Sequence, residues 1–279
     1  MTGRQAAGSR WQAAGSGRQV AGGKRQAVVS SFTIIKGSLI SETYQIFRGW
    51  DFSRGREENL RQAVDTNAIG ASSTNWLRDV YKVLHRRFEP SGEDRPLVEL
   101  AQGGCDLEKW RPLLLWHMTR DEFLVRDFLA NWLYPQFQEG ALRVRTDDLL
   151  PYLTSLHAKG LVEDAWSEST LERVASGLLR IAVDFGLMTG AIVREFASYH
   201  LPDQCFIYLL HALKEKLPSA RQVVHAPDWR MYFLEPDDVE RELFRHHQFR
   251  RLNYEVAGSL AQLTLPCTTA AAYAREMLS

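Results

Sequence analysis

The sequence predicts a mainly α-helical protein of two helical domains: an N-terminal helix-turn-helix-like bundle and a C-terminal winged-helix-like domain with a short β-hairpin. Apolar residues recur at helical spacing through most of the 279 residues, often between a Ser, Thr or Asp that starts a helix and a Gly that ends it. Strand-like alternation is clear only near the C-terminus. The composition, 45% hydrophobic and 24% charged, is typical of a globular chain with a buried core.

Residues 1–27 are predicted to be a disordered tail rich in Arg, Gln, Gly and Ala. They contain one aromatic residue, five basic residues and no acidic residue. Such a segment buries too little apolar surface to offset the entropy of ordering. It is either a basic arm that lies on DNA phosphates or an extension without a role, and its widely spread charges favour the extension.

The N-terminal domain is expected over residues 28–140. A Gly-containing turn at Asn67–Gly70 separates the second predicted helix from the third, and Pro90–Pro96 forms a loop. A break from Pro135 to Gly140 ends the domain. The predicted helices are Leu39–Phe47, Arg56–Val64, Ser72 or Ser73 to Phe88, Leu97–Gln102, Leu107–Met118 and Asp121–Leu133.

The C-terminal domain is expected over residues 141–279. The predicted helices are Thr146–Ala158, Ser167 or Ser169 to Phe185, Pro202–Lys216, Ser219–Val224, Pro236–Phe249 and Thr268–Leu278. Between the last two, apolar residues alternate with polar or small ones on both sides of Ala257–Ser259, which predicts a β-hairpin.

Enzyme motifs are missing from the sequence, so a non-enzymatic protein without metal or cofactor is expected. His246 and His247 are adjacent and would point about 100° apart on a helix, unlike a chelating pair at i and i+4. The acidic pairs Asp147-Asp148 and Asp237-Asp238 fall at predicted helix starts, where capping explains them. Three scattered cysteines and the lack of a long apolar run favour a soluble, cytoplasmic protein.

The stretch from Arg56 to Phe88 has the helix-turn-helix pattern and is the first candidate DNA-binding site. Its second helix has a polar face, since residues spaced three and four apart share one face. The opposite side is an apolar stripe of Trp76, Leu77, Val80, Val83 and Leu84. Ser72 and Ser73 leave hydroxyl and backbone N–H groups at the N-terminus of this helix, where a phosphate binds readily. A solvated surface helix is the alternative interpretation. The residues of the polar face are Asn75, Arg78, Lys82 and Arg86.

Two other regions are candidates for DNA binding. The helix that starts near Ser167 has a polar side of mixed charge, which favours a packing role over DNA binding. Arg245, Arg250 and Arg251 lie just before the hairpin, so they could hold phosphates in a winged module. A solvated helix end explains these arginines equally well.

Several short stretches together carry a family resemblance. They are Ile35–Thr43, the Asn67–Ser73 turn, Arg111–Trp116, Trp166–Thr170 with Ala175–Leu179, Pro227–Arg230 and Tyr254–Ser259. In this order they resemble the BrxA family of BREX (bacteriophage exclusion) defence systems, over about residues 31–279. The resemblance implies an N-terminal fold similar to an RNA-antitermination factor and binding to double-stranded DNA.

The resemblance also implies partners among the other BREX proteins: a DNA methyltransferase, an ATPase and an alkaline-phosphatase-like component. The family has been labelled an inner-membrane protein, whereas the short, charged apolar runs here predict no membrane contact. The expected function is a non-enzymatic accessory protein that binds duplex DNA with low sequence specificity. The alternative is an interaction scaffold without nucleic-acid contact, favoured by the 29 basic against 34 acidic residues of positions 28–279.

Overall fold

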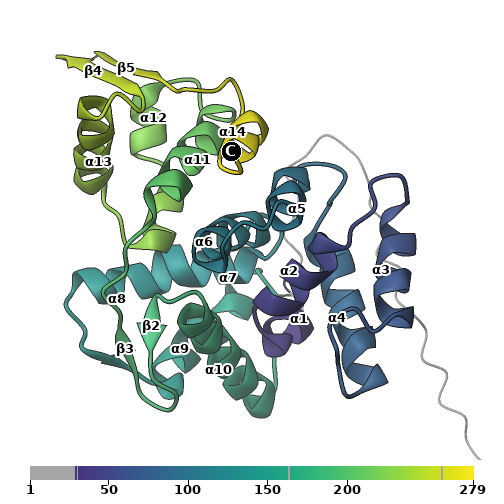
Figure 1. The fold of residues 1–279 in the computed structure, drawn as a ribbon. Coiled ribbons are helices and arrows are strands. Elements are labelled where there is room, and N and C mark those ends of the chain that lie inside the picture. The colour runs from purple at the N-terminus through teal and green to yellow at the C-terminus, as the bar shows by residue number, and fades with distance from the viewer. Residues whose placement is uncertain (1–28, 30, 163, 259) are drawn as a thin grey trace, which may run out of the picture.

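The structure, a computed structural model, describes residues 29, 31–162, 164–258 and 260–279. The described chain is mainly α-helical with two small antiparallel sheets (Figure 1), which confirms the predicted class. The predicted tail of residues 1–27 lies outside the described residues. Over the described ranges, every helix is too short or too polar to cross a bilayer.

The first half of the chain is a succession of helices. They are α1 (Ser31–Lys36), α2 (Ile40–Arg48), α3 (Arg56–Asp65), α4 (Thr74–Arg87), α5 (Arg95–Gln102), α6 (Leu107–Met118), α7 (Phe123–Asp127), the π-helical η1 (Phe128–Leu133) and α8 (Tyr134–Gln138). Helices predicted over α2 to α6 agree with these bounds to within two residues. Helix α1 was not predicted, because its six residues are too few for a periodic pattern.

The expected break at Pro135 is wrong, because helical backbone continues through α8 and ends only before Gly140, where φ is 75°. A proline inside a helix removes one hydrogen bond and crowds the turn before it. Here the turn before Pro135 is the wider π-helical turn η1, which accommodates the ring. The left-handed Gly140 then ends the segment.

The second half mixes helices with short strands. Its elements are β1 (Arg143–Val144), α9 (Thr146–Ala158), α10 (Glu168–Asp184), β2 (Met188–Thr189), β3 (Arg194–Phe196), α11 (Asp203–Lys214), α12 (Ala220–Val224), the 3-10 helix η2 (Pro227–Tyr232), α13 (Pro236–Gln248), β4 (Asn253–Ala257), β5 (Leu260–Thr264) and α14 (Ala270–Glu276). The β4–β5 hairpin is confirmed, with Asn253 opposite Thr264. The sheet of order β1-β3-β2 was not predicted, since two or three residues show no alternation.

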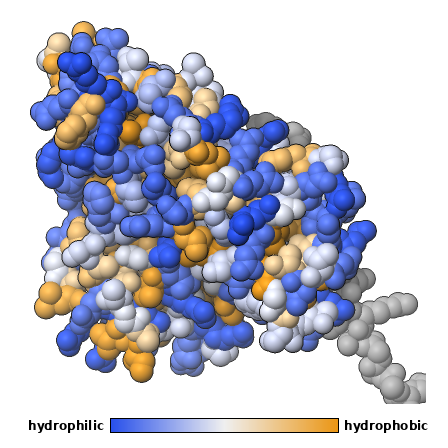
Figure 2. All heavy atoms as spheres, viewed as in Figure 1, coloured by the Kyte–Doolittle hydropathy of each residue, from blue (hydrophilic) through white to orange (hydrophobic). Residues whose placement is uncertain are grey.

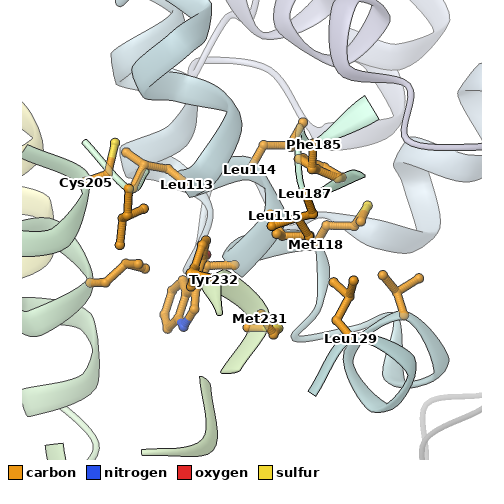
Figure 3. Packing of buried hydrophobic residues seen from close by; sticks show 14 of the residues in the cluster. Leu113, Leu114, Leu115, Met118, Leu129, Phe185, Leu187, Cys205, Met231 and Tyr232 are labelled. Carbon is orange, nitrogen blue, oxygen red and sulfur yellow. The ribbon is translucent and has the colours of Figure 1, made fainter. Parts of the chain in front are cut away.

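Helix α6 lies at the centre of the hydrophobic core, and its residues from Leu113 to Met118 are all buried. Figure 3 shows Cys205, Phe185 and Met231, from three other segments, gathered around the leucines of α6. A helix that is apolar on all sides belongs inside a fold. Elements on the two sides of residue 140 also pack together, as α1 does with α10 and α5 with α14. The division into two domains there stays a prediction.

A buried ion pair holds α4 against this core. The side chain of Arg87 is fully buried, and its Nε lies 2.9 Å from Oε1 of Glu122. The same guanidinium donates to the backbone oxygens of Thr33 at 2.8 Å and Ser38 at 3.3 Å. The inner side of α4 is therefore anchored to α1, and its outer side is left for other contacts.

Candidate nucleic-acid interface

Helices α3 and α4 lie side by side at one end of the molecule (Figure 1). Helix α3 buries only Asn59 and Leu60, so it covers little of the core. The buried residues of α4 are Leu77, Val80, Val83, Leu84 and Arg87. They include most of the apolar stripe expected from the sequence, whereas Trp76 is half-buried.

The polar face predicted for α4 is exposed in the structure, at Asn75, Arg78, Lys82 and Arg86. Among the described residues, neither Arg78 nor Lys82 forms an ion pair or a side-chain hydrogen bond. The one acidic residue of α4, Asp79, is bound by Nζ of Lys36 at 2.6 Å. Arg78 and Lys82 thus present their charge to solvent.

The N-terminus of α4 also lacks negative charge. Ser73 is the N-cap with extended backbone, and its side chain makes no capping hydrogen bond, while Ser72 is exposed beside it. The first turn of α4 contains no acid. Its first N–H groups have no acceptor inside the helix, and the helix dipole adds positive potential there. This end of α4 therefore suits a phosphate.

Helices α9 and α13 begin differently. The carboxylate of Asp148 accepts a hydrogen bond from the backbone N–H of Arg145 at 2.7 Å. Asp238 accepts in the same way from Glu235 at 3.0 Å. Both acidic pairs therefore lie at helix starts, as the sequence predicted, and the second acid of each pair caps its helix.

The arginines near the C-terminus have carboxylate partners, which the sequence did not predict. Arg245 and Arg251 both bind Asp203 at the start of α11, and Arg245 also binds Glu242 at 2.6 Å. The hydrogen bond from Arg245 lowers the pKa of Asp203 to about 2. Arg250 is exposed, with a left-handed φ of 57°. The carboxylate of Asp203, which is 42 residues from Arg245 in the sequence, neutralises much of the positive charge of this cluster.

His246 and His247 have separate structural roles. His246 is fully buried and stacks on Phe206, and burial lowers its pKa. Nδ1 of His247 accepts the backbone N–H of Tyr254 at 3.1 Å, which fastens the hairpin to α13. One possible metal-ligand set exists here, because Asp203, Glu242 and His246 have ligand atoms within 4.8 Å of one another. Arg245 already binds both carboxylates, so a cation would have to displace it.

The β4–β5 hairpin offers little to a phosphate backbone. Its strands contain one charged residue, Glu255. Leu260, near the turn, is 75% exposed. A DNA-binding wing normally contributes cations, so the winged-helix function of this region stays a prediction.

The face of the molecule in Figure 2 is mainly hydrophilic, with hydrophobic residues in separate patches. Fold and surface together define a mainly α-helical protein in which α4 presents two exposed cations, Arg78 and Lys82, that have no carboxylate partner within the described ranges. The family model of BrxA matches residues 31–212, and the chain belongs to the BrxA family. No curated protein matches the chain.

Membership of this family makes the chain a protein of the BREX phage-defence systems, and it suggests other BREX proteins as partners. BrxA is not a family of known enzymes. The matched range contains α4 and ends within α11, so it covers less of the chain than the resembling stretches do. Helix α13 and the hairpin, with Arg245, Arg250 and Arg251, lie beyond it.

Proposed function

We propose that this chain is a non-enzymatic accessory protein that binds duplex DNA through the outer face of α4. The observation that carries this proposal is the exposed row of Arg78, Lys82 and Arg86, of which the first two have no carboxylate partner among the described residues. Ser72, Ser73 and the first turn of α4 extend the row with phosphate-binding groups.

Binding with little sequence preference is expected. Arginine and lysine side chains along a helix face contact phosphates, which position a protein on DNA without reading its sequence. Asn75 is the one amide of this face, and it could contact an adenine edge. A single such contact discriminates weakly between sequences.

The test is the triple variant Arg78→Ala, Lys82→Ala and Arg86→Ala. Each lost phosphate contact should lower the log–log salt slope of binding by about 0.9, so the slope should fall by about 2.7 and every duplex should bind more weakly. Alanine favours helix, so the melting temperature should stay close to that of the wild type. Fluorescence anisotropy with unrelated duplexes at several salt concentrations measures the slope.

The matched variant is Arg245→Ala, Arg250→Ala and Arg251→Ala. It removes the same charge from a cluster that is largely neutralised, so duplex binding should persist. If this variant loses binding and the α4 variant binds normally, the DNA surface belongs to the C-terminal region instead.

The second candidate function is a protein-interaction scaffold of the defence complex. The excess of acidic residues over positions 28–279 favours it, because negative charge repels DNA outside local patches. Leu142 and Ile192 are more than four-fifths exposed, as interface residues of a free subunit often are. A scaffold should show the same weak duplex binding in the wild type and in both triple variants.

A further inference from the structure

A cavity of about 420 Å³ lies where the α1–α2 connection meets α4, α6 and α10. Its volume falls within the roughly 300–1,000 Å³ that is usual for small-ligand sites. The chain from Ile35 to Glu42 forms one wall, and the other lining residues are Trp76, Leu107, Arg111, Arg180 and Asp184. We propose that this cavity binds a phosphate-type oxyanion.

Two unpaired guanidinium groups line the cavity from different helices. Arg111 comes from α6 and Arg180 from α10, and among the described residues neither guanidinium group forms a hydrogen bond or an ion pair. The Nε of Arg111 is buried without an acceptor. A buried donor without an acceptor is costly, and in native structures it commonly indicates a bound ion or water. Guanidinium groups bind oxyanions with two parallel hydrogen bonds.

The backbone at the start of α2 adds further donors. Gly37 and Leu39 both have left-handed backbone, with φ of 86° and 53°. This turn leads into the first residues of α2, Ile40 to Glu42, which line the cavity. N–H groups in the first turn of a helix have no acceptor inside the helix, and the dipole favours an anion there.

Carboxylates in the same cavity limit the charge that it can accept. Asp184 accepts a hydrogen bond from the Ser38 hydroxyl at 2.6 Å, and Glu42 is a second lining carboxylate. Lys36 also lines the cavity, but it is bound to Asp79. Two free guanidinium groups facing two carboxylates suit one phosphate group, whereas a polyphosphate chain would meet Glu42 or Asp184.

The walls of the cavity are held rigidly. Helix α1 lies so close to α10 that a Cβ atom on Gly177 would lie 2.8 Å from the carbonyl oxygen of Ile34. The buried Arg87 also donates to the backbone oxygens of Thr33, inside α1, and of Ser38, in the connection after it. A site with fixed walls loses little freedom when it binds a ligand.

The oxyanion has two possible sources. Trp76 belongs to both α4 and the cavity, so a phosphodiester of a duplex on α4 could reach the site, an outcome that rests on the proposed function. The phosphate group of a free small molecule is the other source. Inorganic phosphate represents the chemistry that both share.

Calorimetric titration of the full chain with inorganic phosphate, against chloride at equal ionic strength, tests the site. Saturable binding is expected in the wild type, and Arg180→Ala and Arg111→Met should each weaken it about tenfold, since each removes a charge-assisted contact. Arg173→Ala is the matched control, because Arg173 is exposed on the same helix α10 but lies outside the cavity.

Absence of phosphate binding in the wild type would overturn the proposal, as would wild-type binding by Arg180→Ala. If Arg111→Met fails to fold, Arg180→Ala still tests the proposal, because Arg180 is exposed. Duplex titration of Arg180→Ala then separates the sources: a parallel loss of duplex affinity identifies a DNA phosphate, and unchanged duplex affinity identifies a free one. If the α4 triple variant still binds DNA while phosphate binding holds, the proposed function fails and this site stands.

Discussion

Helices α4 and α13 both carry several basic residues, yet they present different surfaces. Helix α4 begins without acid, and among the described residues Arg78 and Lys82 have no carboxylate partner. Helix α13 begins with Asp237 and Asp238, and its Arg245 is bound to Asp203 and Glu242. The number of cations along a helix therefore does not measure its positive surface. The positive surface depends on the carboxylates that pair with these cations, from the helix itself or from other segments.

Two neighbouring arginines within α4 also differ, because Arg87 is buried in an ion pair and Arg86 is exposed. Replacement of Arg87 by Met should lower the free energy of unfolding by about 3–5 kcal/mol, because it leaves the buried carboxylate of Glu122 without its charge partner. Among the described residues, the Thr33 hydroxyl, at 3.0 Å, is the other side-chain partner of the Glu122 carboxylate. Urea denaturation measures the change as a shift of the midpoint.

Arg86→Ala is the matched control, because Arg86 is exposed one residue earlier. Its effect should stay within about 0.5 kcal/mol. Equal midpoints for the two variants would show that the Arg87–Glu122 pair does not anchor α4.

A smaller effect on stability is expected from the ion pairs of Arg245 and Arg251 with Asp203. The double variant Arg245→Ala and Arg251→Ala should lower stability by about 1 kcal/mol, since solvent screens this partly exposed cluster. The folded-state pKa of Asp203, about 2, lies below its ordinary value of 3.8, so the carboxylate stabilises the fold above about pH 4. That contribution is lost as the pH falls from 4 toward 2.

Thermal unfolding of both proteins between pH 2 and 7 checks the sign. The gap between wild type and double variant should be full at neutral pH and should narrow below pH 4. A gap that widens on acidification would mean that another group, not Asp203, is responsible.

The smallest effects concern two serine caps. The hydroxyl of Ser167 accepts a hydrogen bond from the N–H of Thr170 at 3.4 Å, whereas Ser73 makes no capping bond. Ser167→Ala should therefore cost about 0.5–1 kcal/mol, and Ser73→Ala less than about 0.5 kcal/mol. If the Ser73 hydroxyl binds a phosphate of the duplex, Ser73→Ala should weaken duplex binding with little change in melting temperature. A larger loss of stability at Ser73 than at Ser167 would contradict this.

Most helices of this protein are determined by local sequence. The Ser167 cap, the apolar periodicity of each helix and the left-handed Gly160 and Gly186 act within a few residues. Helices α9 and α10 therefore begin and end close to where the sequence predicts. The exposed face of α4 follows from the same periodicity, because residues three and four apart share a side of a helix. The BrxA resemblance also lies in the linear order of short stretches, and the family match confirms it.

Tertiary structure alone decided which charges meet. Asp203 neutralises Arg245, and Glu122 binds Arg87, across separations of 42 and 35 residues that no local pattern encodes. The same holds for the short strand β3, which pairs with β1 across 50 residues, and for the arginines that converge on the α2 cavity. Such contacts depend on how whole elements pack around α6, because burial and distance in three dimensions determine the energy of a charge.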